Sequence, residues 1–121
     1  MSRVIHFEIP STDPDRSMTF YREVFGWEFN RWGEEPYWLV KTGEDEVPGI
    51  NGAIASQKYP EQPVINTVEV TDIEQTIKAV EKQGGEIVVS KMAVPTVGFI
   101  IYFKDPDGYV SGALQPDANA S

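Results

Sequence analysis

The side chains that could perform chemistry in this chain are few. His6 is the only histidine among 121 residues, and there are no cysteines. Without cysteine, the chain can form neither a disulfide nor a thiolate nucleophile or thiolate metal site. Glu8 follows two residues after His6, so in an extended strand both side chains lie on one face. An imidazole beside a carboxylate can transfer a proton or contribute to a metal site.

Two interpretations of His6 remain open at this point. The imidazole is either a partly buried group held by hydrogen bonds, or a base or lone metal ligand. A single histidine provides no nucleophile–base pair, and the sequence contains no glycine-rich loop for phosphate. The acidic stretch Asp105–Gly108 has proline second and glycine fourth, which is typical of a tight turn rather than of a binding loop.

The elements that must position His6 and Glu8 begin with a strand over residues 4–9. Apolar side chains alternate with these two polar ones along it, and Pro10 is expected to end it. One face of this strand is therefore predicted to join a core, while the other face carries the imidazole and the carboxylate.

Two helices are predicted, over residues 14–25 and 72–83. Asp13 can cap the first helix by accepting hydrogen bonds from free N–H groups, and Gly26 ends it. The second helix begins at Thr71–Glu74, whose residue types have the spacing of a capping box. Both helices carry apolar residues at helical spacing, which predicts one buried face for each.

Three strands follow each helix, so the order of one strand, one helix and three strands occurs twice. The strands other than the first are expected at residues 27–32, 36–41, 52–56, 64–70, 86–90, 98–103 and 109–114. A repeat of roughly 60 residues with the same order of elements indicates a duplication. An unrelated α+β fold with eight strands is the alternative.

The chain is expected to form a single domain, because 121 residues with a hydrophobic fraction of 40% can bury a core. Module one is placed at about residues 1–56 and module two at about residues 64–115. Residues 57–63 form the connection between them. Residues 116–121 are expected to fray, because they provide no apolar anchor.

The charge of the chain limits its partners. Asp and Glu number 19 against 10 Lys and Arg, which gives a formal net charge of −9. Such a chain is not expected to bind nucleic acid, which requires basic patches. No stretch approaches the ~20 apolar residues of a membrane span, and no signal peptide is recognisable. We therefore expect no membrane partner and a cytoplasmic location.

Several short motifs follow one another in a fixed order along nearly the whole chain. They are His6, Asp13–Ser17, Phe20–Trp27, Gly84–Gly85, Gly98–Phe99 and Asp105–Tyr109. In this combination the chain resembles the vicinal oxygen chelate superfamily, which includes glyoxalases, bleomycin resistance proteins and extradiol dioxygenases. Through Pro48–Gly52 and Gly112–Gln115 it is most similar to a group of short glyoxalase-like proteins.

This resemblance implies an α+β fold in which two βαβββ modules form an open, cup-shaped mixed sheet. It also implies a homodimer, with Trp27, Trp38 and Val40 as expected contributors to the shared surface. In glyoxalase I-like members the cup holds a divalent metal, bound by one His or Glu from each of four strands. That metal acts as a Lewis acid toward the vicinal oxygens of the substrate.

The four positions that the resemblance assigns to metal ligands mostly carry other residue types. They are His6, the stretch Gly52–Ala55, either Ile65 or Asn66, and Gly112. Ile65 is preferred at the third position, because Val68 and Val70 then face the helix. One conventional ligand does not make a catalytic metal site, so we expect neither a metal cofactor nor glyoxalase I activity.

With this register, Thr67 and Glu69 face the interior of the cup, as His6 and Glu8 do. An unconventional site of His6, Glu8 and Glu69 would offer a divalent metal one imidazole and two carboxylates. The alternative leaves both carboxylates in solvent at the rim. Aromatic side chains of the strands belong either to the core or to a small-molecule pocket. The pocket candidates are His6, Glu8, Trp32, Trp38, Thr67, Glu69 and Phe99.

Three functions are compatible with these residues. The first is binding of a small apolar or aromatic molecule without the usual divalent metal, which the missing ligands favour. The second is catalysis by a lyase, isomerase or dioxygenase of the glyoxalase-like class, metal-dependent or metal-independent, that uses His6 and nearby carboxylates. The third is a structural or regulatory dimer whose cup is filled by its own side chains.

Overall fold

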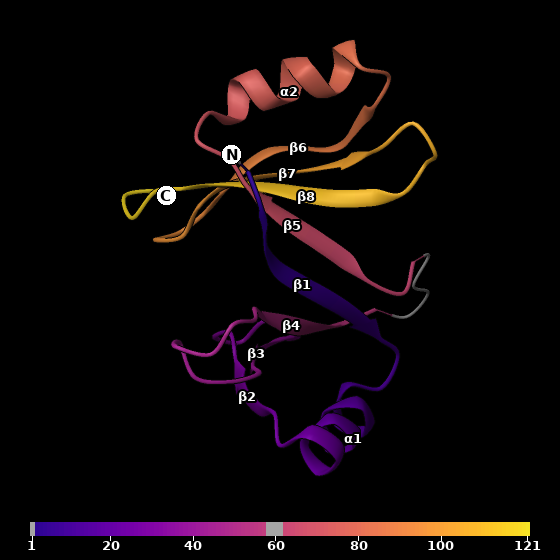
Figure 1. Ribbon diagram of the computed structural model, residues 1–121, viewed down its shortest axis with the longest axis vertical. Helices are drawn as coiled ribbons and strands as arrows, with labels where there is room; N and C mark the ends of the chain where they lie inside the picture. Colours follow the sequence, from indigo (N-terminus) through magenta and orange to yellow (C-terminus); the bar gives the residue numbers. More distant parts are fainter. Residues whose placement is uncertain (1, 58–61) are drawn as a thin grey trace. The chain divides into compact units, whose positions relative to one another are not determined.

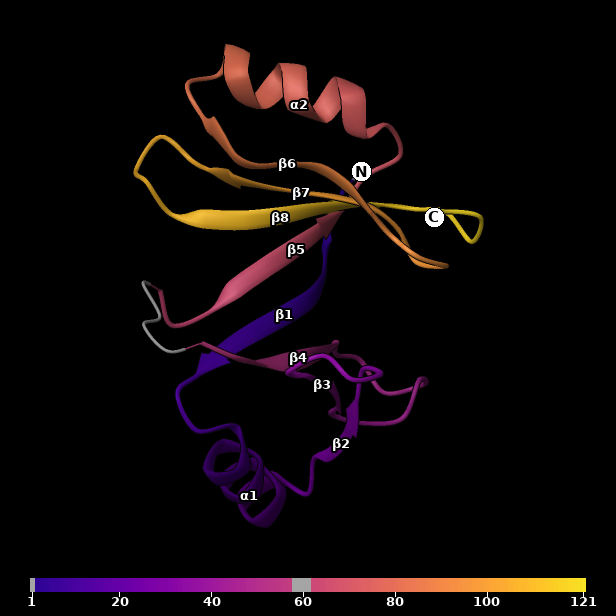
Figure 2. The same cartoon turned by 180° about the vertical axis from the view of Figure 1, so that it is seen from behind.

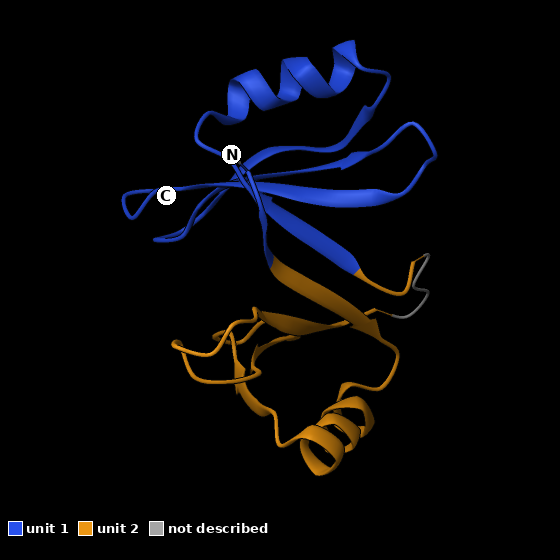
Figure 3. Cartoon of the chain, viewed as in Figure 1, with its two compact units in different colours: residues 1–5, 65–121 blue, residues 6–64 orange. Residues whose placement is uncertain are grey.

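The computed structural model describes residues 2–57 and 62–121 of the chain. These residues divide into two compact units (Figure 3). Residues 6–57 and 62–64 form what we call the N-terminal unit, and residues 2–5 and 65–121 form the C-terminal unit. Most of the predicted connection, residues 58–61, lies outside the described residues.

The elements follow the predicted order of strand, helix and three strands, twice (Figure 1). The first five are β1 (Val4–Ser11), α1 (Pro14–Phe25), β2 (Glu28–Arg31), β3 (Tyr37–Lys41) and β4 (Asn51–Ser56). The second five are β5 (Ile65–Glu69), α2 (Ile73–Lys82), β6 (Glu86–Val94), β7 (Gly98–Lys104) and β8 (Val110–Pro116). Strand β1 crosses the division between the units after Ile5.

Each unit contains a mixed sheet of four strands with the same topology. In the N-terminal unit the strand order is β2-β3-β4-β1, and in the C-terminal unit it is β5-β8-β7-β6. The first and last strands of each module pair in parallel, and the other neighbours pair antiparallel. The predicted α+β class and its two βαβββ modules are therefore confirmed.

The ends of both helices are set by short polar side chains and glycine. The carboxylate of Asp13 accepts a hydrogen bond from the Arg16 N–H at 3.2 Å, as predicted, and Gly26 ends α1 with φ 75°. The capping box predicted for the second helix is wrong. Asp72 caps α2 instead, which leaves Glu74 at the second helical position, too early to bond back to the cap.

Strand β1 continues past Pro10, contrary to the prediction that this residue ends it. Pro10 lies opposite Ala55 of β4, and the parallel pairing extends to Ser11. In a parallel ladder only alternate residues donate to a given neighbouring strand, so the missing N–H of proline can be tolerated.

One face of each sheet packs against the helix of its own unit (Figure 1, Figure 2). Met18, Val40 and Ile54 form the buried centre of the N-terminal unit, and Trp27 and Trp38 pack against them. Val40 is only 2% exposed within this core. It therefore cannot contribute to a dimer surface as we had expected, because its strand turns this face toward α1.

The expected fraying of residues 116–121 is wrong. Strand β8 extends to Pro116, the Asp117 N–H donates to the Val97 carbonyl at 2.9 Å, and the Thr96 N–H donates to the Ala120 carbonyl at 3.0 Å. The side chain of Ala120 is itself buried. This segment is held by backbone hydrogen bonds to the β6–β7 turn. Such bonds are not visible in the pattern of apolar residues on which the prediction of fraying was based.

The turn at Asp105–Gly108 is confirmed, with a 2.9 Å hydrogen bond from the Gly108 N–H to the Asp105 carbonyl. Among the described residues, neither helix is long and apolar enough to cross a membrane.

Candidate functional site

The second face of the N-terminal sheet, opposite α1, carries polar residues from all four strands. In the register of the strands, His6 of β1 lies opposite Asn51 of β4, and Lys41 of β3 lies opposite Glu28 of β2. The next residues on the same face include Glu8, which lies opposite Ala53. Alternation along each strand thus brings imidazole, amide, ammonium and carboxylate groups to one surface.

On this surface, Tyr37 of β3 reaches across the sheet to His6 of β1. Its Cα lies opposite Ala55 of β4, yet its hydroxyl is 2.9 Å from Nε2 of His6 on β1. The ring must therefore extend over β4, where Ala53 has only a methyl side chain and is 0% exposed. The hydroxyl also hydrogen-bonds the carboxyl group of Glu8. Small residues on β4 thus allow a three-residue hydrogen-bonded network to form.

Burial changes the titration of both ionisable members of this network. It raises the pKa of Glu8 above its ordinary value, an effect that the hydrogen bond from Tyr37 partly opposes. Burial also lowers the pKa of His6 below its ordinary value of 6.5. At neutral pH the imidazole is therefore uncharged and can accept or donate a hydrogen bond.

These shifts predict how stability depends on pH. The folded state binds the Glu8 proton more tightly than the unfolded chain does, so this group makes stability fall as pH rises above 4.5. His6 acts in the opposite sense, because its contribution is lost as pH falls below 6.5. In urea unfolding, Glu8→Gln should therefore gain stability relative to the wild type as pH rises from 4.5 to neutrality. Glu69→Gln, which changes an exposed carboxylate, is the control. If the stability difference between Glu8→Gln and the wild type does not change with pH, the raised pKa of Glu8 is contradicted.

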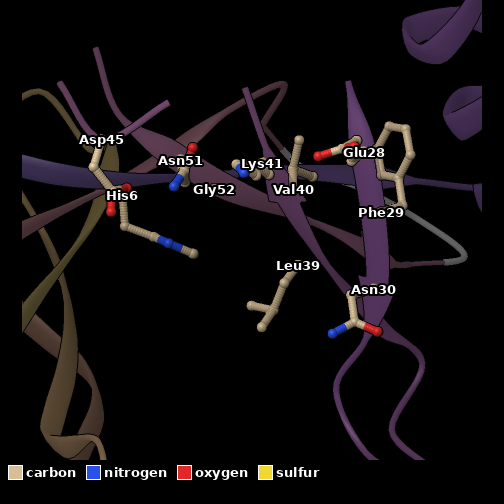
Figure 4. Close-up of a pocket in the computed structure, with 10 residues that line it drawn as sticks. All are labelled: His6, Glu28, Phe29, Asn30, Leu39, Val40, Lys41, Asp45, Asn51 and Gly52. Atoms are coloured by element: carbon tan, nitrogen blue, oxygen red, sulfur yellow. The ribbon is translucent and has the colours of Figure 1, made fainter. Parts of the chain in front are cut away.

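A pocket of about 450 Å³ opens beside His6 in the N-terminal unit. Figure 4 shows the side chains of His6, Leu39 and Asn30 pointing toward a common space. The full lining consists of His6, Glu28, Phe29, Asn30, Leu39, Val40, Lys41, Asp45, Asn51 and Gly52. An apolar side chain combined with a few hydrogen-bonding groups is typical of a small-molecule site.

The amide of Asn51 is oriented by the loop that follows β3. Its Oδ1 accepts a hydrogen bond from the Thr42 N–H at 2.9 Å. The Thr42 hydroxyl lies 3.3 Å from the same oxygen and makes its shorter hydrogen bond, 2.6 Å, to the Ile50 carbonyl. With the oxygen used in this way, the amide NH₂ is the group left to donate elsewhere. Asn51 is therefore fixed as a hydrogen-bond donor in the pocket wall.

The aromatic pocket candidates do not gather at this pocket. Trp38 packs into the core beneath α1, where the Arg31 guanidinium lies 5.2 Å from its ring centre. Trp32 lies in the β2–β3 loop, where its backbone N–H donates to the Tyr37 backbone carbonyl. Phe99 packs toward the core beneath α2 in the C-terminal unit. Of the seven candidates, only His6 is among the residues that line the pocket. Glu8 is connected to His6 through the hydroxyl of Tyr37, which hydrogen-bonds both side chains.

The remaining candidates belong to the C-terminal unit. Val68 and Val70 face the α2 core, which confirms the register with Ile65, Thr67 and Glu69 on the opposite face. Glu69 is exposed, whereas Thr67 is buried and lies opposite Gly112 of β8. A Cβ atom at position 112 would lie 3.1 Å from the Thr67 hydroxyl and 3.2 Å from the Tyr102 ring. A larger side chain at position 112 would therefore have to displace Thr67 or Tyr102 slightly.

The residues present do not fit the divalent metal that the resemblance implies. Nε2 of His6 is hydrogen-bonded to Tyr37, Ala53 is fully buried and has no donor atom, and Gly112 has no side chain, with the Thr67 hydroxyl and the Tyr102 ring close to where its Cβ atom would lie. In the described part of the chain, no group of three or more His, Asp or Glu side chains could hold a metal ion. Of the unconventional site, His6 and Glu8 belong to the N-terminal unit and Glu69 to the C-terminal unit.

Among the lining residues, the sequence analysis named only His6 as a pocket candidate. Asn30, Leu39 and Asn51 were missed, as was Tyr37, which holds His6. One signal could have found Tyr37 and Leu39. Strand β3 reads Tyr-Trp-Leu-Val-Lys, so once its tryptophan and valine are assigned to the core, the other positions must face the opposite side.

Comparison with known proteins identifies related sequences and folds. The model of the Glyoxalase/Bleomycin resistance protein/Dioxygenase superfamily matches residues 3–111. A glyoxylase-like domain-containing protein from Didymella fabae is 29% identical over an alignment of 114 residues, and the match covers 84% of this chain and 84% of that protein.

Two solved structures share the fold. A glyoxalase/bleomycin resistance protein/dioxygenase superfamily member from Vibrio splendidus has a TM-score of 0.66 and 20% identity, covering 93% of this chain and 97% of that one. A methylmalonyl-CoA epimerase from Mycobacterium tuberculosis has a TM-score of 0.66 and 13% identity, covering 94% of this chain and 87% of that one. At such identities the likeness concerns the fold alone.

Proposed function

Because the chain belongs to the Glyoxalase/Bleomycin resistance protein/Dioxygenase superfamily, we propose that it binds a small molecule in the pocket of its N-terminal unit. The observation that carries this proposal is the pocket of about 450 Å³ in which Leu39 lies beside His6 and Asn30. Its ligand has an apolar part, which contacts Leu39, and a part with hydrogen-bonding groups. The proposed binding needs no divalent metal; this part is supported by the residue types at the four implied ligand positions, of which only His6 carries a usual metal ligand.

A thermal-shift screen of metabolites and antibiotics tests this proposal. A ligand present at a hundred times its dissociation constant should add about 2.7 kcal/mol to the free energy of unfolding, and chelator should not remove the effect. Leu39→Trp, which fills the pocket, should abolish the shift. Tyr109→Trp, a similar enlargement at an exposed position of the C-terminal unit, should keep it.

Comparison of the two variants also shows where a ligand binds. The melting temperatures of both variants without ligand show whether each is folded. A compound that stabilises Leu39→Trp as strongly as the wild type would place its site elsewhere and contradict the proposal. A shift that depends on added divalent metal would contradict the metal-free part of it.

A second candidate is metal-independent acid–base catalysis at the same pocket. It is favoured by an uncharged imidazole that lines the pocket and is held by Tyr37 and Glu8. Such a group can accept a proton from a bound molecule. The fate of a ligand found in the screen separates the two candidates: a binding protein returns it unchanged, whereas an enzyme converts it, and His6→Gln would stop the conversion.

A further inference from the structure

The hydroxyl of Tyr37 lies between two partners that make different demands on it. Nε2 of His6 is 2.9 Å away, and the Glu8 carboxyl group is the other partner. A phenol has one proton to donate, and its oxygen can accept a hydrogen bond at the same time. An ionised carboxylate can only accept, whereas a neutral imidazole nitrogen can do either.

These requirements allow one arrangement of protons when Glu8 is ionised. The phenol must donate its proton to the carboxylate, because Glu8 has none to give. The phenol oxygen then accepts from His6, which requires a proton on Nε2. Nδ1 is left without a proton, as the only acceptor of the ring.

We infer that Tyr37 is a positioning residue that, held by Glu8, fixes His6 in the Nε2–H tautomer and makes Nδ1 the hydrogen-bond acceptor of the pocket. Among the described residues, the hydrogen bond of the imidazole is at Nε2, and no fully buried side-chain nitrogen or oxygen lacks a partner. Nδ1 is therefore accessible, on a side chain that lines the pocket.

The consequence of this tautomer for ligand binding rests on the proposed function, and it indicates the class of ligand. Asn51 presents donors through its NH₂ group, whereas Nδ1 of His6 on the neighbouring strand presents an acceptor. A complementary ligand carries an acceptor, such as a carbonyl, close to a donor, such as a hydroxyl or an N–H group. A purely apolar molecule would leave both unpaired.

The single histidine makes the tautomer directly measurable. In protein labelled with ¹⁵N-histidine, all imidazole nitrogen signals come from His6. At a pH above about 6.5, where a histidine is ordinarily neutral, we expect the proton on Nε2 and an unprotonated Nδ1. In Glu8→Leu the phenol has no carboxylate to bond, so it donates to Nε2 and the imidazole proton moves to Nδ1.

Two further variants keep the test decisive. Glu69→Leu, at an exposed carboxylate of the C-terminal unit, should leave the tautomer unchanged. If Glu8→Leu does not fold, Tyr37→Phe removes the partner of Nε2, and exchange of the Nε2 proton with water should become faster. A wild-type protein with its proton on Nδ1, a folded Glu8→Leu that keeps it on Nε2, or unchanged exchange in Tyr37→Phe would overturn the inference. No ligand is added, so the result is independent of the ligand screen.

Discussion

Replacement of Gly52 by alanine is expected to cost about 3 kcal/mol of folding free energy, because there is no space for the added methyl group. A Cβ atom at this position would lie 2.4 Å from the Phe7 carbonyl oxygen and 2.7 Å from the Phe7 ring. Phe7 is the residue opposite Gly52 in the parallel pairing of β1 with β4. Since a backbone atom is involved, relief requires the two strands to separate.

The same separation would move His6 away from Asn51, so ligand binding should weaken in Gly52→Ala as well. Urea unfolding measures the loss of stability. Gly43→Ala is the matched control, because no atom lies within 4 Å of a Cβ there and its backbone does not require glycine. If both variants have the same stability, the close approach of β1 and β4 at this point does not exist.

Truncation of Ile54 to alanine is the second change with a large expected effect, a loss of about 2–5 kcal/mol. Ile54 is 0% exposed and packs with Met18 of α1 and Val40 of β3. Removal of its side chain leaves a cavity beneath the strand that carries Asn51 and Gly52. Ile54→Val removes one methylene and should cost only about 0.5–1.5 kcal/mol.

Denaturant unfolding of this graded series tests the packing of β4 on α1. Val47→Ala, at a position that is 60% exposed, should change stability little. A loss in Ile54→Ala no larger than that in Val47→Ala would mean that Ile54 does not contribute to the core of the N-terminal unit.

Much of the fold was predictable because its signals are local. Asp13 and Gly26 delimit the first helix through hydrogen bonds within a few residues, and the alternation of apolar residues defines the strands. The register of β5 also followed from local alternation, since Val68 and Val70 must share a face. The predictions failed where the conformation depends on hydrogen bonds to backbone groups distant in the sequence. An example is the C-terminal segment, in which the Asp117 N–H donates to the Val97 carbonyl.

The site was less predictable, because it depends on contacts between distant strands. Tyr37 and His6 are 31 residues apart, and their contact requires both the strand order and the small side chain of Ala53. As an aromatic residue of a strand, Trp38 is a pocket candidate in the sequence, yet its face of β3 packs against the core beneath α1. The size and aromatic character of a side chain do not indicate which face of its strand is open. The assignment of an adjacent residue to the core does indicate it, because successive side chains point to opposite faces.

The measurement that most directly tests small-molecule binding at this pocket is ¹H–¹⁵N NMR mapping with a hit from the ligand screen, in the presence of chelator. We expect saturable shifts that are largest for His6, Asn30, Leu39 and Asn51, and that disappear in Leu39→Trp. Shifts confined to the C-terminal unit, or binding that requires a divalent metal, would contradict the proposed function.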